Sequence, residues 1–421
     1  MSLDRDLIRR TQEEKLRALL RALESNEFLR EKLEGGATIE KLSDLKRLPF
    51  TTKSELVEEQ ARHPPFGRLP TFPRSRYRRL HRTSGTSGRP LLWLDTDEDW
   101  ETWMRCWGEV YRGAGVTEED VVFLAFSFGP YVSHWSAMEG ASRTGALCVS
   151  GGGQSSLQRL QAILDHRCTV VLSTPTYALH LAEVASANGI DLAGSSVRKT
   201  IHAGEPGASV RNVRRRIEEA WGARAFDHAG ATEVGAWGFD CLEDDHAMHL
   251  NELEFVFEVV EPGGDREIPD GERGELVITN LGRHGMPVLR YRTGDLVVRT
   301  SEPCGCGRTF ARIEGGVLGR ADDMLIVRGV NLYPSAIDDV VRSCTGIVEY
   351  EVEIRTREGM DDLLIKLETT DETGYERADR ELVDAFRARF HIRVATTRSA
   401  SGSLPRYELK AQRYKRFTET A

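Results

Sequence analysis

The sequence predicts an α/β protein with more than one domain, and three observations support this expectation. The chain has 421 residues, which is too long for one compact hydrophobic core. Between residues 120 and 280, short apolar runs typical of strands alternate with helical stretches. Near residue 320, glycines and acidic residues interrupt this alternation, and a new strand follows. We therefore expect a large multi-sheet domain followed by a smaller α+β domain.

Apolar spacing and capping residues predict the elements of the first domain in order. Leu16, Leu19, Leu20 and Leu23 recur at helical spacing, so an amphipathic helical region is expected within residues 1–35. The segment LPFTTK at 48–53 predicts a loop that leads into a helix capped by Thr51 or Thr52. Further along, we expect strands at 121–126, 169–172 and 274–279 and helices at 157–165 and 210–221.

The second domain is expected to begin where glycines and acidic residues cluster. Gly315-Gly316 and Gly319-Arg320 precede Asp322-Asp323. We therefore place the boundary near Asp322, with one domain at residues 1–321 and the other at 322–421. In the second domain we expect a strand at 324–327 and helices at 336–343 and 376–390.

Composition and charge exclude several classes of function. The formal net charge is -9, whereas a nucleic-acid partner requires a basic surface. No apolar run approaches the ~18 to 20 residues that span a bilayer, and the charged N-terminus has no signal-peptide core. The cytoplasm is the expected location. Four cysteines are expected to be small core residues rather than disulfide partners: Cys106, Cys148, Cys168 and Cys344.

The segment HRTSGTSGRP at 81–90 is typical of a phosphate-binding loop. Glycines let the backbone approach a ligand, and hydroxyls with unpaired amides can surround an oligophosphate. The segment lacks the GxxxxGK[ST] order of the P-loop NTPases, so those enzymes are not indicated. Taken alone, it could equally be a Ser/Gly-rich surface turn.

Other motifs follow this loop in a fixed order. They are AGEP at 203–206, DHAGATE at 227–233, YRTGDL at 291–296, GRADD at 319–323 and RGVN at 328–331. In this order and spacing the chain resembles the adenylate-forming superfamily, which includes acyl-CoA synthetases and luciferases. Within it, the chain resembles the phenylacetate–CoA ligase family, because LPFTTK at 48–53, GGGQ at 151–154, TPTY at 174–177 and GSLPR at 402–406 also fit.

This resemblance implies ATP-dependent conversion of an aryl carboxylic acid to an acyl-adenylate, followed by transfer to coenzyme A. The implied cofactors are ATP, Mg²⁺ and coenzyme A. Two alternatives stay open: transfer to a carrier-protein pantetheine, an amine or another small nucleophile, and a non-catalytic nucleotide-binding regulator. A homodimer and a carrier-protein partner also stay open, whereas nucleic-acid and membrane partners are not expected.

The resemblance also implies a role for each nucleotide-site residue. Arg89 stands where many relatives carry lysine and would pair with phosphate. Glu233 would ligate Mg²⁺, unless it is only a helix N-terminal charge, and Thr232 would bind the α-phosphate. Asp295 would accept both ribose hydroxyls, unless it is a β-turn aspartate, and Arg320 would flank the ribose. The residues implied for the β- and γ-phosphates are Thr83, Ser84, Gly85, Thr86, Ser87 and Gly88, and those implied near adenine are Gly204, Glu205, Pro206, His228, Ala229 and Gly230.

Ala229 departs from the family pattern, which usually has an aromatic residue that lies against adenine at this position. The missing ring removes a stacking surface. Trp237 and His228 are the rings that could replace it.

Two residues of the predicted second domain are implied in catalysis. Lys410 in PRYELK would reach the substrate carboxylate and the α-phosphate together, and its charge would oppose the repulsion between two anions. The alternative is a solvated basic tail. Asp322 matches the family's hinge, about which the second domain would rotate between the two half-reactions, and the alternative is an ordinary interdomain turn.

The acyl pocket is expected to have aromatic walls with glycine between them, which suits a flat aryl ring. Ser133 and His134 hint at a polar substituent on that ring, although His134 could instead satisfy a neighbouring carbonyl. The residues expected to line the pocket are Tyr131, Ser133, His134, Trp135, Gly151, Gly152 and Ala203.

A structural Zn²⁺ site is predicted from cysteines and a histidine. Cys304-Gly305-Cys306 is a tight thiolate pair, and Cys241 lies upstream with two histidines close behind. Four N/S ligands suit structural zinc, and some relatives that resemble this chain have histidine in the place of His249. His246 is the alternative fourth ligand, and reduced cysteines without metal are the alternative to the whole site.

Overall fold

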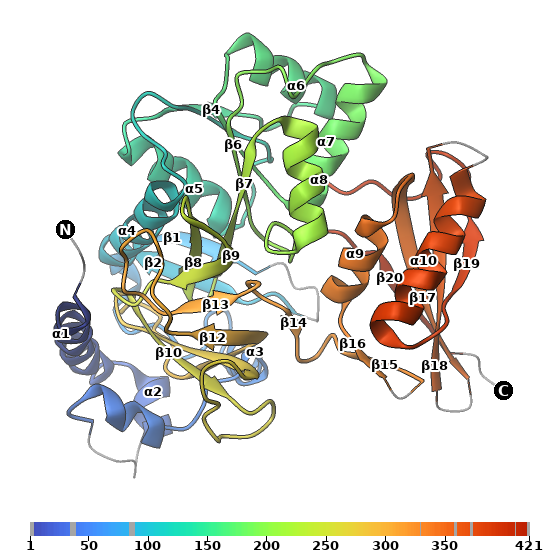
Figure 1. The fold of residues 1–421 in the computed structure, drawn as a ribbon. Helices are drawn as coiled ribbons and strands as arrows, with labels where there is room; N and C mark the ends of the chain where they lie inside the picture. Colours follow the sequence, from blue (N-terminus) through green and yellow to red (C-terminus); the bar gives the residue numbers. More distant parts are fainter. Residues whose placement is uncertain are drawn as a thin grey trace.

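A 12-stranded sheet runs through the N-terminal body of the protein (Figure 1). The structure is a computed structural model that describes residues 4–33, 39–83, 89–328, 330–357, 360–370, 374–408 and 410–418. One half of the sheet is parallel and consists, in spatial order, of β4 (Leu147–Ser150), β3 (Val121–Leu124), β5 (Val170–Ser173), β6 (Lys199–His202) and β7 (Arg224–Ala231). The antiparallel half continues from β7 with β8 (Gly235–Cys241), β9 (Asp244–Leu250), β13 (Arg312–Glu314), β12 (Tyr291–Thr300), β11 (Arg273–Asn280) and β10 (Phe255–Val260), and β14 (Gly319–Arg320) pairs with β12.

Four helices connect the parallel strands: α5 (Val132–Arg143), α6 (Ser156–Asp165), α7 (Pro175–Ala187) and α8 (Arg211–Trp221). Leu160, Leu181 and Ile217 are buried in one core with Phe123 and Val171 of the sheet. Since parallel strands joined by crossover helices all end at the same edge, the loops that follow these strands meet there.

The elements that precede β3 in the chain, from α1 to α4, form the rest of the N-terminal body. Helix α1 (Arg5–Leu23) buries Leu16, Leu19 and Leu23, and α2 (Glu27–Leu33) follows it after a turn. Thr52 caps α3 (Lys53–Arg62): its hydroxyl accepts a hydrogen bond from the Glu55 amide, and the Glu55 carboxylate accepts one from the Thr52 amide. The remaining elements are η1 (Leu42–Arg47), η2 (Arg74–Arg76), the hairpin of β1 (Tyr77–Arg82) and β2 (Leu92–Thr96), and α4 (Asp97–Gly113).

The C-terminal unit, orange to red in Figure 1, has its own six-stranded sheet and its own core. Ile337 and Phe386 of its two helices pack on Val352 and Ile365 of the sheet. Its strands are β15 (Leu325–Val327), β16 (Val330–Leu332), β17 (Ile347–Arg357), β18 (Met360–Thr369), β19 (Ala395–Arg398) and β20 (Tyr414–Thr418), and its helices are α9 (Pro334–Ser343) and α10 (Gly374–Phe390). Helix α9 lies beside α8 of the body (Figure 1).

The predicted fold class is confirmed, and the predicted strands and helices are present with bounds shifted by a few residues. The predicted N-terminal helical region consists of two helices. Cys106, Cys168 and Cys344 are buried as predicted, and Cys148 is partly buried. Among the described residues, no helix is both long enough and apolar enough to cross a bilayer. The boundary at Asp322 and the cytoplasmic location stay predictions.

Candidate active site

The predicted motifs follow the carboxyl ends of the parallel strands. Gly151 comes directly after β4, Thr174 after β5, Ala203 after β6 and Thr232 after β7. In α/β sheets, ligands bind outside these strand ends. The fold therefore brings motifs that are far apart in sequence to one edge of the sheet.

Glu233 is buried, with 4% of its surface exposed, in the turn between β7 and β8. Its Oε1 atom accepts a hydrogen bond from the Tyr291 hydroxyl at 3.3 Å and lies 3.3 Å from the Lys53 ammonium. The carboxylate is therefore held by one neutral donor and one cation. A buried carboxylate with its oxygens fixed in this way is suited to bind a hard cation.

The backbone on both sides of Glu233 is held by the loop after β11. Arg283 Nη1 donates to the Thr232 carbonyl at 2.9 Å, and the Asn280 side-chain amide donates to the Val234 carbonyl. Arg283 also donates through Nε and Nη2 to Asp95 Oδ1, at 3.0 and 2.6 Å. Since Asp95 lies in β2, this buried arginine links the backbone around Glu233 to the hairpin that carries the predicted phosphate loop.

Asp295 and Arg320 face each other across paired strands. They are register partners on β12 and β14, with Arg320 Nη1 3.5 Å from Asp295 Oδ1. Arg320 also donates through Nε and Nη2 to Asp322, at 2.9 and 3.2 Å. Burial raises the pKa of Asp295 to about 6, although Arg320 opposes this shift. The three residues predicted for the ribose and the hinge therefore form one charged group.

Lys410 comes from the C-terminal unit and lies against the loop after β6. A Cβ atom on Gly204 would be 3.7 Å from Lys410 Cε, so the loop approaches the lysine closely. The Glu205 carboxylate accepts hydrogen bonds from the Ala411 amide and from the Thr176 amide, both at 2.9 Å. Loss of hydration lowers the pKa of Lys410, whereas the negative charges of Glu205 and Asp295 raise it. The ammonium group therefore lies within the electrostatic influence of Asp295, the carboxylate predicted to bind the ribose.

Further contacts hold the C-terminal unit in this position. Arg406 donates to Glu183 of α7 at 2.6 and 2.8 Å. Arg159 of α6 is almost fully buried, yet its Nη1 atom lies 3.4 Å from the Glu408 carboxylate of the C-terminal unit. Asn212 of α8 donates to the Asp339 carboxylate at 2.8 Å.

Only the two ends of the phosphate loop are described. The Thr83 amide donates to the Leu91 carbonyl at 3.0 Å, and its hydroxyl accepts from the Leu91 amide at 3.0 Å. Arg89 is exposed. The other predicted residues of the loop lie outside the described residues: Ser84, Gly85, Thr86, Ser87 and Gly88.

The predicted acyl pocket lies at the start of α5. The His134 ring stacks on Phe126 at 4.3 Å between ring centroids, and the Tyr131 ring meets it edge-on at 5.8 Å. Burial lowers the pKa of His134 to about 4, so the imidazole is neutral at pH 7. Among the described residues, its buried Nδ1 atom has no hydrogen-bond partner.

The other residues predicted for this pocket differ in their exposure. Trp135 is 48% exposed, and its indole N–H donates to the Gly129 carbonyl. Ser133 and Gly152 are exposed, Gly151 is buried and Ala203 is partly buried.

The suggested replacements for the ring missing at Ala229 are both buried. Trp237 packs near Phe257 in the core. The His228 ring lies 4.6 Å from Trp107, and its Nδ1 atom shares a hydrogen bond with the Gly238 carbonyl. Neither ring therefore presents a free face to a nucleotide.

The structure brings the four predicted zinc ligands together. Ligand atoms of Cys241, His249, Cys304 and Cys306 lie within 4.8 Å of one another. Cys241 Sγ is 3.6 Å from Cys304 Sγ, and Cys306 Sγ is 3.4 Å from His249 Nε2. His246 is exposed and lies outside this group.

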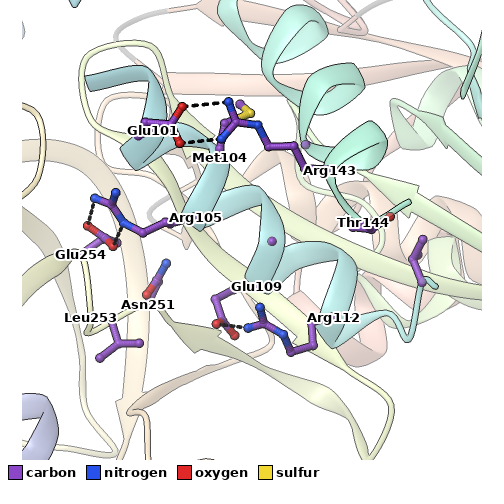
Figure 2. Close-up of a pocket in the computed structure, with 13 residues that line it drawn as sticks. Glu101, Met104, Arg105, Glu109, Arg112, Arg143, Thr144, Asn251, Leu253 and Glu254 are labelled. Carbon is purple, nitrogen blue, oxygen red and sulfur yellow. Dashed lines mark hydrogen bonds and ion pairs between the residues drawn. The ribbon is translucent and has the colours of Figure 1, made fainter. Parts of the chain in front are cut away.

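A separate hollow of about 560 Å³ lies between α4, α5 and the segment after β9 (Figure 2). Charged side chains line it, but they pair with one another: Arg143 with Glu101, Arg105 with Glu254 and Arg112 with Glu109. None of the described site residues lines this hollow. Its paired charges leave no group there for the predicted chemistry.

Several functional candidates escaped the sequence analysis. Arg283, Asn280 and Arg159 were not predicted, because each acts on the site through contacts with distant segments. The available signal was that Arg283 lies close before the apolar run Met286-Pro287-Val288-Leu289, since an arginine buried with such a run requires a partner. That signal identifies a buried arginine but not the carbonyl that it binds.

Comparisons with known proteins agree with this geometry. Residues 24–284 match the family of AMP-binding enzymes, and residues 329–415 match the AMP-binding enzyme C-terminal domain. The chain is 33% identical to the phenylacetate–coenzyme A ligase of Thermus thermophilus over 396 residues, which cover 91% of this chain and 87% of that ligase. It is 32% identical to the phenylacetate–coenzyme A ligase of Escherichia coli over 382 residues, which cover 88% of this chain and 85% of that ligase.

A solved structure of 2-hydroxyisobutyryl-CoA ligase in the postadenylation state matches with a TM-score of 0.92 and 30% identity, over 98% of this chain and 90% of that chain. The same ligase in the thioesterification state gives 0.74, over 99% and 91%. The two units of this chain are therefore arranged as in the postadenylation state. The resemblance predicted from the motifs is confirmed, and the chain belongs to the AMP-binding, adenylate-forming enzymes and, among these AMP-forming acid–CoA ligases, to the phenylacetate–CoA ligase family.

Proposed function

We propose that this protein activates an aryl carboxylic acid with ATP and transfers the acyl group to coenzyme A. The observation that carries this proposal is the position of Lys410 beside Glu205 and Asp295, at the edge where the parallel strands end. A carboxylate and a triphosphate repel each other, so their reaction requires positive charge at the place where they meet. An ammonium group delivered by the C-terminal unit supplies it.

In the first half-reaction, a carboxylate oxygen of the acid attacks the α-phosphorus of ATP. The bond between that phosphorus and the β-phosphate oxygen breaks, diphosphate leaves, and a mixed anhydride with AMP remains. We assign Lys410 to both anions, Thr232 to the α-phosphate, and Asp295 with Arg320 to the ribose. We assign Thr83, Arg89 and the residues between them to the β- and γ-phosphates.

Glu233 would hold the Mg²⁺ ion of the nucleotide. Its burial and its fixed backbone support this assignment, because Mg²⁺ requires a rigid oxygen ligand close to substrate phosphates. When bound, the ion would neutralise charge on the phosphate oxygens.

In the second half-reaction, the thiol of coenzyme A attacks the acyl carbon and AMP leaves. We propose that the unit 322–421 rotates about Asp322 between the two steps and removes Lys410 from the acyl group. The two TM-scores against one ligase in two states support such a rotation in a relative. Asp322 is bound by Arg320 alone among the described side chains, and this single contact would allow the turn to reorganise.

The substrate proposal rests on the aromatic surroundings of His134. Phe126, Phe128, Tyr131 and Trp135 gather around the start of α5, and the imidazole between them is neutral. Flat apolar walls suit an aryl ring, and the unpaired Nδ1 atom suits a hydroxyl or amino substituent on it.

The Cys/His group fits a structural zinc ion. Tetrahedral zinc with Zn–S bonds of about 2.3 Å and Zn–N bonds of about 2.0 Å places sulfurs about 3.8 Å apart and sulfur about 3.6 Å from nitrogen. The 3.6 Å between Cys241 and Cys304 and the 3.4 Å between Cys306 and His249 are close to these values. Elemental analysis of protein purified without chelator should find about one zinc per chain, and a zinc-free protein would contradict the site.

Diphosphate release tests the whole proposal. Purified protein with ATP and Mg²⁺ is assayed against a panel of phenylacetate, benzoate, hydroxy- and amino-substituted aryl acids and 2-hydroxyisobutyrate, each with and without coenzyme A. We expect one burst of release without coenzyme A, because the adenylate stays bound, and continuous turnover with it. The aryl acids should give the highest kcat/KM.

Each of the other possible results would point to a different acceptor, substrate or function. Turnover only with a carrier protein or an amine would show that this molecule, and not coenzyme A, is the acceptor. Faster turnover of 2-hydroxyisobutyrate than of any aryl acid would overturn the substrate assignment alone. Absence of release with every acid would indicate a nucleotide-binding regulator.

A further inference from the structure

The motif LPFTTK at residues 48–53 brings a second lysine to the proposed ATP site. Thr51 is buried and pairs with the start of β12: its amide donates to the Arg290 carbonyl at 3.0 Å, and its carbonyl accepts from the Arg292 amide at 2.9 Å. Its hydroxyl donates to the Leu289 carbonyl at 2.7 Å. These contacts fix the chain two residues before Lys53, which is the first residue of α3.

The fixed segment directs Lys53 at Glu233. Residue Tyr291, the β-bridge partner of Thr51, donates its hydroxyl to Glu233, and the Lys53 ammonium lies 3.3 Å from the same carboxylate oxygen. Among the described residues, Glu233 is the one ionic partner of Lys53, whose side chain is 37% exposed. The ammonium therefore keeps donors free for a further anion.

Lys53 lies close enough to Lys410 for the charges of the two ammonium groups to interact. The positive charge of Lys53 is one of the effects that lower the pKa of Lys410. The two ammonium groups come from opposite ends of the chain, Lys53 from α3 and Lys410 from the loop before β20.

We propose that Lys53 is a phosphate-binding residue that contacts the β- and γ-phosphates of ATP and the departing diphosphate. This inference rests on the proposed function, in particular on Glu233 as the Mg²⁺ ligand. Oxygens that share one Mg²⁺ ion, at about 2.0 to 2.1 Å each, lie about 3 to 4 Å apart. Phosphate oxygens on an ion held by Glu233 would therefore lie as far from its carboxylate as the Lys53 ammonium does.

The chemistry of the motif supports a ligand role over simple neutralisation. Lysine is a compact cation that binds phosphate as a point charge. The predicted phosphate loop at 81–90 contains arginines and no lysine, and Lys53 brings a lysine from another segment. When Mg²⁺ takes the Glu233 carboxylate, the ammonium needs a new partner, and the charge that forms on diphosphate as its bond to the α-phosphorus breaks would provide one.

Equilibrium binding tests the proposal without turnover. Calorimetry in the presence of Mg²⁺ measures the affinities of ATP, inorganic diphosphate and AMP for the wild type, Lys53→Met, Lys53→Arg and Arg62→Met. Arg62→Met is the matched control, because it removes a cation from the exposed far end of α3. We expect Lys53→Met to weaken ATP and diphosphate by about ten-fold or more while AMP changes by less than about two-fold.

The two remaining variants sharpen the result. Lys53→Arg should retain most of the affinity, since a guanidinium group also binds phosphate, and Arg62→Met should bind all three ligands like the wild type. Equal loss of ATP and AMP in Lys53→Met would overturn the proposal, because it indicates a general disturbance of the site. Unchanged ATP binding in Lys53→Met would overturn it as well, leaving Lys53 as a counter-ion of Glu233. A wild type that binds none of the three ligands would instead overturn the proposed function, and this inference with it.

Discussion

The two sides of the candidate active site are held by different kinds of contact. On the body side, the backbone carbonyls on either side of Glu233 accept hydrogen bonds from the side chains of Arg283 and Asn280, and Arg283 is itself paired with buried Asp95. On the C-terminal side, Lys410 is held in place by ion pairs at the surface between the units, such as Arg406 with Glu183. Buried pairs are costly to break, whereas partly exposed pairs exchange readily with water. The residues around Glu233 are therefore held rigidly, whereas the contacts that hold Lys410 in place can be exchanged more easily.

The largest expected effect comes from breaking the buried side. Arg283→Met leaves the Asp95 carboxylate, 1% exposed, without its cation, and should lower stability by about 3 to 5 kcal/mol. Arg143→Met is the matched control, because it removes an exposed arginine that donates twice to Glu101 and once to Glu139, and it should cost at most about 1 kcal/mol. Denaturant midpoints measure both, and equal shifts would remove the distinction between buried and exposed pairs.

Removing the mobile cation should separate the two half-reactions. Lys410→Ala should slow adenylation by about 10² to 10³, the usual effect of losing one donor to developing charge. Thioester formation from supplied acyl-adenylate should change little, because Lys410 is absent from that step. Single-turnover assays of each step measure this, with Lys415→Ala, which pairs with Glu351, as control. Equal losses in both steps would contradict the assignment.

The ribose side should depend on pH. Burial raises the pKa of Asp295 to about 6, so its carboxylate is charged above that pH and protonated below it. Because the charged form is the better acceptor for two hydroxyls, the affinity for adenosine, which has the ribose but no titrating phosphate, should fall about ten-fold between pH 7 and pH 5. Titration calorimetry over this range measures the affinity. Asp295→Asn should remove the pH dependence, and an unchanged slope would assign it to another group.

The smallest effect is expected from the exchangeable side. Glu183→Gln removes the negative charge with which Arg406 pairs. Adenylation should slow only about two- to five-fold, since a partly exposed ion pair contributes up to about 1 kcal/mol. Thioester formation should stay constant or rise. The same single-turnover assays measure both rates, and a loss as large as that of Lys410→Ala would show that this contact is not replaceable.

Local pattern predicted the fold and the loops that form the candidate site. Glycine, hydroxyl and acidic residues at fixed positions identified the loops after β4, β6 and β7, because these loops are defined by residues next to one another in sequence. The position of Lys410 near Asp295 followed from the family resemblance rather than from spacing. The role of the residues between Thr83 and Arg89 in binding the β- and γ-phosphates stays a prediction.

Residues that act through distant contacts could not be predicted. Nothing near Arg283 in sequence identifies Thr232 or Asp95 as its partners, because these contacts exist only once β2, β7 and β11 have assembled. The choice between His246 and His249 is different, since they are three residues apart in a strand and therefore point to opposite faces. If residues 244–250 are recognised as a strand, only one of the two histidines can face the same side as the cysteines and share a metal with them.

The pairing of Arg159 with Glu408 has a consequence for the interval between the two half-reactions. The guanidinium group binds the Gly151 carbonyl and the Ser127 hydroxyl inside the body, whereas its carboxylate partner belongs to the other unit. Any rotation that carries Glu408 away leaves a net positive charge next to the predicted acyl pocket. An acyl-adenylate is an anion, so departure of the C-terminal unit would strengthen its retention at the moment when the enzyme must wait for a thiol.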